Sequence, residues 1–229
     1  MDGFDSLRRY IQHDAAFYTM QKEWVPSKIT DIIEKGIDAD TAEAFARTLK
    51  NLKSKSEGTI EFNWAMRIAN IILDNSALFE ESAEILFSAL ERYFPLPECF
   101  TSGEDIIGWK KATAIPKGSD ILIKLRIPAD AKKSCALGKK CRCSYAIVEG
   151  MWNINIDEAP YGAGDTWIHI CTVGDEFDGE AESWNTENFI YMKGQYVYPD
   201  KFDERRFVEC SNGIHFFLDK ESAMHYGRL

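Results

Sequence analysis

The segment Pro95-Leu96-Pro97 divides the chain into two parts whose apolar residues recur with different periods. Before it, as in 59–73, apolar side chains return every three to four residues, which is the period of an amphipathic helix. After it, apolar and polar residues alternate over 121–127, as in a half-buried strand. Because proline cannot continue a helix, the sequence predicts a boundary here between domains 1–97 and 98–229.

The first domain is predicted to be all-α, with about five helices. Asp5 is a suitable N-cap for a helix over 5–24, and further helices are expected to begin at Asp40 and Ser76. The polar stretch 50–58 is expected to be a loop.

The second domain is predicted to be a mixed, mostly antiparallel β domain with a short C-terminal helix, which makes the whole chain α+β. Strands are expected over 121–127, 145–148, 166–173 and 214–218. Asp219 is placed to cap the final helix.

Charge is divided sharply within this second domain. Residues 110–142 contain ten Lys or Arg and two Asp, a net +8 in a chain of net charge −10. The following 48 residues, 143–190, contain no Lys or Arg, and their ten acids fall within an acidic segment, 149–187. This pattern favours one surface that takes an anionic ligand and another that rejects it. The net negative charge argues against general DNA binding.

The basic segment 110–142 supplies most of the candidate ligand-binding residues. Lys124 and Arg126 are two apart on a predicted strand and therefore share a face. Lysine pairs flank the small-residue loop 134–138, whose backbone amides could surround an anion. The alternatives are a solvated strand edge and pairing with the acidic segment of the chain itself. The ligand-binding candidates are Lys124, Arg126, Lys132, Lys133, Lys140, Arg142, Trp109, Tyr191 and His215. Trp109, Tyr191 and His215, with Tyr145, are the groups that could stack on a base.

Catalytic and metal sites are not predicted. Cys141-x-Cys143 has a shorter spacing than structural zinc sites use, so small buried cysteines are the better interpretation. Cys210 and His215 are five residues apart across an Asn-Gly turn, but nothing marks an oxyanion hole beside them. No cofactor is expected.

The N-terminus is acidic and lacks the apolar core of a signal peptide, and no apolar run reaches the length of a membrane span. Six cysteines are too few for a disulfide scaffold in a chain of 229 residues. We therefore expect a cytoplasmic protein without a membrane partner, with thiols mostly free.

Four segments carry a family resemblance: Gly108-Trp109-Lys110-Lys111, 124–132, Lys140-Cys141-Arg142-Cys143 and 209–217. In this order they resemble successive motifs of an uncharacterised domain found in bacteriophage and large-DNA-virus proteins, often attached to pentapeptide repeats. The resemblance covers about residues 105–228, and here a helical region precedes the domain instead of the repeats. It implies a phage or prophage protein acting in a bacterial cytoplasm, and it transfers no activity.

These features favour a phage-encoded binding protein that acts by occupancy, as an inhibitor of host defence. Its partner would be an anionic nucleotide that it sequesters or a host defence protein on which it docks, and the hypothesis allows a homodimer. One alternative is a nucleotide-acting enzyme using His215 or Glu209, because 213–216 and the following helix are similar to a strand and helix of ADP-ribosyltransferases. That comparison lacks the later strands and the catalytic Glu of those enzymes. The other alternative is a structural or interaction module of the phage.

Overall fold

The computed structural model of the chain describes residues 37–56, 69, 80–116, 118–136, 139–160, 167–208 and 211–227. It divides into two units, Met1–Pro95 and Leu96–Leu229, so the break lies within the Pro95-Leu96-Pro97 segment. The helix predicted over 5–24 lies outside the described residues, as does all but residue 69 of the one predicted over 59–73.

Two helices are described in the first unit, α3 (Ala39–Ser56) and α5 (Glu80–Tyr93). The carboxylate of Asp38 caps α3 by accepting a hydrogen bond from the Thr41 amide at 2.7 Å. The loop predicted over 50–58 is wrong, because α3 continues to Ser56. Residues 37–57 contain neither glycine nor proline, so the polar residues after Lys50 extend the helix. The rest of the predicted all-α domain stays a prediction.

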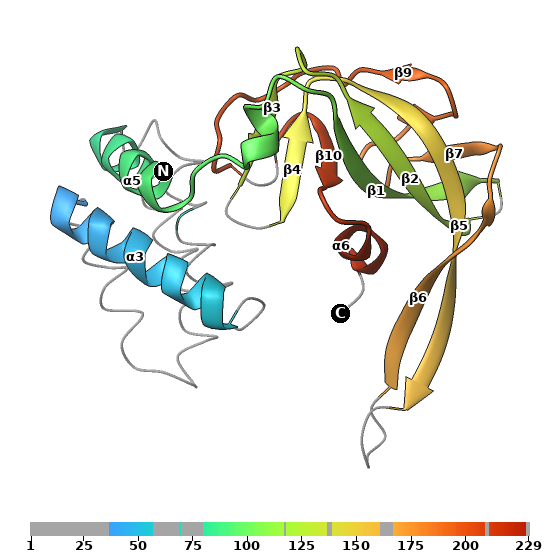
Figure 1. Cartoon of the computed structure of the whole chain (residues 1–229), viewed down its shortest axis with the longest axis horizontal. Coiled ribbons are helices and arrows are strands. Elements are labelled where there is room, and N and C mark those ends of the chain that lie inside the picture. The colour runs from blue at the N-terminus through green and yellow to red at the C-terminus, as the bar shows by residue number, and fades with distance from the viewer. Residues whose placement is uncertain are drawn as a thin grey trace, which may run out of the picture. The chain divides into compact units, whose positions relative to one another are not determined.

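The second unit is an antiparallel β domain with a short C-terminal helix, as predicted (Figure 1). Every strand pairing found among the described residues is antiparallel. The strands run in the order β3-β4-β10-β1-β2-β5-β6; β7 pairs with β1 and β8, and β9 with β5. The elements are η1 (Glu98–Phe100), β1 (Ile106–Ile115), β2 (Asp120–Ile127), β3 (Lys133–Cys135), β4 (Lys140–Cys143), β5 (Ala146–Pro160), β6 (Trp167–Glu176), β7 (Glu180–Glu182), β8 (Ile190–Tyr191), β9 (Tyr196–Val197), β10 (Ile214–Phe217) and α6 (Lys220–His225).

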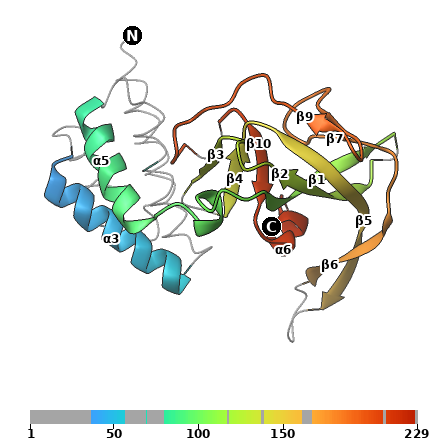
Figure 2. The same ribbon diagram turned by 45° about the horizontal axis from the view of Figure 1, so that its top comes forward.

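Both faces of the sheet are packed. Alternate residues of β2, from Ile121 to Ile127, join Phe216 in the larger core on one face. On the other face Leu122 packs with Phe217 and with Ala223 and Met224 of α6. Figures 1 and 2 both show α6 beside β10. Asp219 caps α6, as predicted, by accepting a hydrogen bond from the Ser222 amide at 2.7 Å.

The sheet opens between β10 and β1. β10 pairs with β4 along its whole length, from Ile214↔Cys143 to Phe217↔Lys140, but with β1 only at Trp109↔Phe217. The same region of β1 next pairs with β7, starting at Thr113. Residues 110–112 of β1 therefore lie beside an opening, and that opening positions the candidate site.

Gly108 on β1 provides a test of this packing. A Cβ atom there would lie 2.6 Å from Phe216 Cδ2 and 2.8 Å from Ile127 Cδ1, both in the buried core. We expect Gly108→Ala to lower the free energy of unfolding by about 1–3 kcal/mol, because neither side chain has room to move. Urea denaturation measures the change. The control Ser119→Ala, on the exposed turn before β2, is expected to shift it by less than about 0.5 kcal/mol. Equal stability of Gly108→Ala and wild type would contradict the packing of β10 on β1.

Candidate functional site

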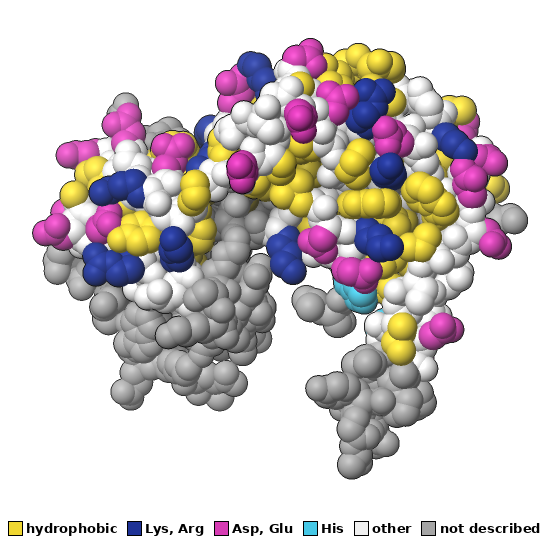
Figure 3. Space-filling view, viewed as in Figure 1, with side chains coloured by type: hydrophobic (Ala, Val, Ile, Leu, Met, Phe, Trp, Pro, Cys, Tyr) yellow, Lys and Arg dark blue, Asp and Glu magenta, His cyan; other side chains and the backbone are white. Residues whose placement is uncertain are grey.

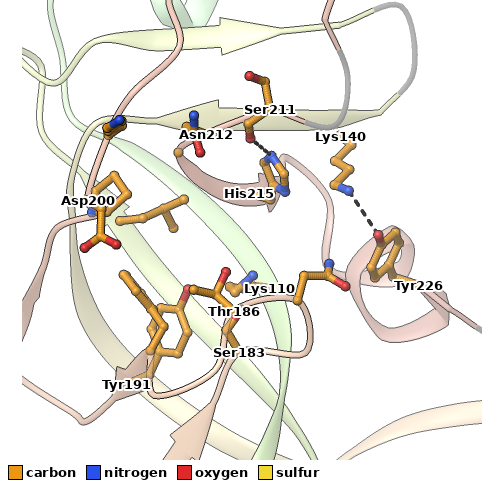
Figure 4. Close-up of a pocket in the computed structure, with 16 residues that line it drawn as sticks. Lys110, Lys140, Ser183, Thr186, Tyr191, Asp200, Ser211, Asn212, His215 and Tyr226 are labelled. Atoms are coloured by element: carbon orange, nitrogen blue, oxygen red, sulfur yellow. Dashed lines mark hydrogen bonds between the residues drawn. The ribbon is translucent and has the colours of Figure 1, made fainter.

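A cavity of about 530 Å³ lies in the second unit, lined by residues of β1, β4, β8 and β10, by three loops and by Tyr226 after α6 (Figure 4). This volume is in the range of small-molecule sites. The strands contribute Lys110, Lys140, Tyr191, Ile214 and His215, and the loops contribute residues of 183–189, 199–201 and 211–213. Most lining side chains are polar.

Three lysines and one aspartate line the cavity, and two of the lysines, Lys110 and Lys140, belong to its strands. Lys110 Nζ lies 5.6 Å from the centroid of the Tyr191 ring. Lys140 Nζ donates a hydrogen bond to Tyr226 Oη at 3.0 Å and lies 4.9 Å from the centroid of that ring. Within the described ranges, neither ammonium forms an ion pair with a carboxylate. The adjacent Lys111 differs, since its Nζ lies 3.8 Å from Asp120 Oδ2.

The pKa values of two lining residues are lowered mainly by burial and secondly by nearby lysine charges. Burial, and secondly the charge of Lys140, lower the pKa of Lys110 to about 8. Burial, and then Lys140 and Lys110, lower the pKa of His215 to about 3, so its imidazole is neutral at physiological pH. Both shifts disfavour additional positive charge in the cavity, and a bound anion would oppose them.

The hydrogen bond of His215 assigns its tautomer. Nε2 lies 2.8 Å from the carbonyl oxygen of Ser211, and because a carbonyl only accepts, Nε2 carries the proton. Nδ1 therefore has a lone pair that can accept a hydrogen bond. A general base needs a pKa near the working pH, so this imidazole is poorly suited to acid–base catalysis.

Five of the six predicted basic residues lie outside the cavity and contact groups of the protein itself. Lys124 Nζ lies 2.9 Å from Glu149 Oε2, and Arg126 pairs with both Asp105 and Glu149 at 2.8 and 3.1 Å. The register of β2 on β5 brings Glu149, in the acidic segment, to this position.

Lys132 and Lys133 are likewise engaged. Lys132 pairs with Glu204, and Lys133 Nζ donates to the carbonyl oxygens of Ala129 and Ala131 at 2.7 and 2.9 Å. On the face shown in Figure 3, acidic and basic side chains intermingle over the strands. The basic segment therefore does not form one continuous anion-binding surface there.

Arg142 anchors the segment that leads into a wall of the cavity. Its side chain is buried, and its guanidinium donates to the backbone carbonyl oxygens of Val208, Arg205 (2.7 Å) and Asp203 (3.3 Å). Residues 199–201 precede this anchored segment, and 211–213 follow it. Arg142 therefore holds the protein's own backbone and does not line the cavity.

Some of the predicted aromatic residues line the cavity and others lie outside it. Tyr191 and His215 line the cavity. Trp109 packs against Trp152, with ring centroids 6.3 Å apart, on the α6 side of the sheet. Tyr145 stacks on Tyr198 at 5.5 Å.

Sequence reasoning placed Lys140, Tyr191 and His215 among the site residues and missed Lys110, Thr186, Asp200 and Asn212. Lys110 had a signal, because it lies with Lys111 inside an otherwise apolar strand, β1. The loop residues had none, since their positions depend on how the loops fold over the sheet.

The cysteines show one pairing that the sequence did not predict. The register of β3 on β4 places Cys135 opposite Cys141, and the two form a disulfide. Cys143 is a free thiol whose pKa burial raises to about 12. In the described part of the chain, no three His, Cys, Asp or Glu side chains cluster as metal ligands would. No described helix has the length and apolar character needed to cross a membrane.

A family model described as a family of unknown function (DUF5758) matches residues 93–163 and 167–223, more than half of the chain. The matched region includes Lys110, Lys140 and His215. No curated protein and no solved structure matches the chain.

The anchoring role of Arg142 predicts a large effect on stability. Arg142→Met leaves backbone carbonyl oxygens without their charged donor, and we expect it to cost about 2–4 kcal/mol of unfolding free energy. Limited proteolysis is expected to cleave first within 203–208. Arg126→Met is the matched control, because it removes only half-exposed ion pairs and should cost less than about 1 kcal/mol. Equal losses for the two variants would contradict the anchor.

Proposed function

The chain belongs to DUF5758, a family of unknown function, and we propose that the cavity within its family-matched region binds a small anionic ligand. The observation that carries this proposal is the pair of ammonium groups, Lys110 and Lys140, which line one cavity without a carboxylate partner among the described residues. The protein then acts by occupancy, sequestering its ligand.

The energetics of Lys110 support an anion as the missing partner. Lowering its pKa from 10.5 to about 8 means that the charged amine is disfavoured by about 3 kcal/mol in the free protein. A phosphate or carboxylate between Lys110 and Lys140 would screen their repulsion and replace the lost hydration of Lys110. Binding of an anion therefore lowers the free energy of charging the buried Lys110 amine.

The remaining lining residues favour a ligand larger than a simple ion. Ser183, Thr186 and Asn212 offer hydroxyl and amide groups that can bond to phosphate or sugar oxygens. Phe189, which is half-buried and packs on the buried Tyr191 with ring centroids 5.2 Å apart, supplies aromatic surface. This combination of cations, neutral donors and an aromatic ring suits a nucleotide, and the cavity volume accommodates one.

The biological setting is part of the same proposal. The resemblance of 105–228 to domains of phage and large-DNA-virus proteins supports a phage-encoded inhibitor in a bacterial cytoplasm. A nucleotide signal of host defence is then the ligand that sequestration would remove.

The ADP-ribosyltransferase-like alternative gains no support from the site. His215 has a strongly lowered pKa and a tautomer fixed by Ser211. Glu209 lies outside the described residues. A binding function needs neither group to transfer a proton.

Replacing the cavity lysines tests the proposal. We expect calorimetry to give a Kd below about 1 mM for at least one of 5′-AMP, cyclic AMP, NAD and pyrophosphate. Lys110→Met and Lys140→Met should each weaken that binding at least about 10-fold, because each removes one of two charges on the anion.

Lys124→Met is the matched control, since Lys124 pairs with Glu149 outside the cavity, and it should leave the affinity within about 2-fold. The proposal fails if none of the four compounds binds. It also fails if Lys124→Met weakens binding as much as Lys110→Met does.

The pKa of Lys110 predicts the pH dependence. A bound anion raises the pKa of Lys110 above its free-protein value of about 8. The affinity is therefore highest below pH 8 and falls above pH 8, as the amine of the free protein deprotonates. Between pH 7.5 and 9.5 we expect 5′-AMP to bind at least about 10-fold more weakly, and its phosphate stays fully ionised over this range. Calorimetry at both values measures this. Lys110→Arg remains charged throughout and should remove most of the dependence; an unchanged profile in that variant would assign the titration to another group.

A further inference from the structure

The cavity lining also contains an acidic residue. Among its lining residues in the described chain, Asp200 is the one carboxylate. Figure 4 shows Asp200 across the cavity from Lys140 and Tyr226, with His215 and Lys110 between them. The lining therefore holds a carboxylate, next to Lys201 in the sequence, on the side of the cavity away from Lys140.

Asp200 makes no ion pair within the described ranges, although Lys201 beside it also lines the cavity. The lining also includes the neutral polar residues Asn212 and Thr186. The Asp200 carboxylate can accept hydrogen bonds from a ligand, and it would repel an anionic group placed against it.

These features restrict the class of ligand. We propose that the ligand places its anionic group at Lys110 and Lys140 and points hydroxyl or amino groups toward Asp200, as a sugar phosphate or mononucleotide does. The inference rests on the proposed function, because it assumes that the cavity binds an anion. An inorganic polyphosphate fits less well, since its far end would meet the carboxylate.

Hydrogen bonds from ligand hydroxyl groups to a carboxylate are charge-assisted, and carboxylates in other nucleotide sites bind ribose hydroxyls in this way. His215 adds a second acceptor, since the lone pair on Nδ1 is free of the bond to Ser211. A site that presents such acceptors selects ligands that carry donors over ligands that lack them. Asp200 is therefore a residue that determines specificity, while the two lysines determine charge.

The test compares two anions in two variants. The probes are 5′-AMP, which has ribose hydroxyls and a base amino group, and pyrophosphate, which has neither. In calorimetry we expect wild type to bind 5′-AMP more tightly than pyrophosphate. Asp200→Ala should weaken 5′-AMP binding at least about 10-fold, while pyrophosphate binding stays within about 3-fold or becomes tighter, because a repulsive charge is removed.

Asp157→Ala is the control, since it removes an acid that is also exposed but does not line the cavity, and it should change neither affinity. The inference is overturned if Asp200→Ala leaves 5′-AMP binding unchanged, or if it weakens both probes equally. In the second case Asp200 would act by holding the loop. Lys110-dependent binding of 5′-AMP that Asp200→Ala leaves unchanged overturns this inference alone, whereas absence of binding by 5′-AMP, pyrophosphate, cyclic AMP and NAD alike overturns the proposed function with it.

Discussion

The pairing of β10 with β4 determines where the site can form. β10 comes from the end of the chain, and its four pairs with β4 place His215 and Lys140 on neighbouring strands. Its single pair with β1, Trp109↔Phe217, joins this ribbon to the rest of the sheet and leaves residues 110–112 beside an opening. The cavity, its two lysines and its histidine all follow from that incomplete pairing.

The cavity lysines differ from the other basic residues of the segment in their partners. Ion pairs and backbone carbonyls engage Lys124, Arg126, Lys132, Lys133 and Arg142, so the charges of these five residues in the basic segment are compensated by the protein's own groups. Lys110 and Lys140 instead lie beside an aromatic ring or a tyrosine hydroxyl, and within the described ranges no carboxylate forms an ion pair with either of them. Charge that is locally uncompensated, rather than charge that is abundant, marks the candidate site.

The sequence predicts elements whose signals are local and fails where distant residues decide. Alternation over 121–127 predicts β2, and Asp219 predicts the cap of α6, because each pattern lies within its own element. Whether a basic side chain is neutralised or buried depends instead on distant residues. Lys124 is neutralised because strand register brings Glu149 to it, and Arg142 is buried because both faces of the short strand β4 are covered. Neither the charge pattern nor the hydrophobic periodicity of the sequence predicts these contacts, because they depend on how distant strands pair.

The ionisation of His215 tests the central claim most directly, because the charges of Lys140 and Lys110 add to burial in lowering the pKa of this imidazole. Its ring resonances can be followed by NMR as a function of pH, with and without pyrophosphate. The account predicts that His215 has a pKa of about 3 in the free protein and that a bound anion raises this pKa, because the anion opposes the charges of Lys110 and Lys140. A pKa near 6.5 in the free protein, or one that saturating pyrophosphate leaves unchanged, would contradict a positively charged, anion-binding cavity.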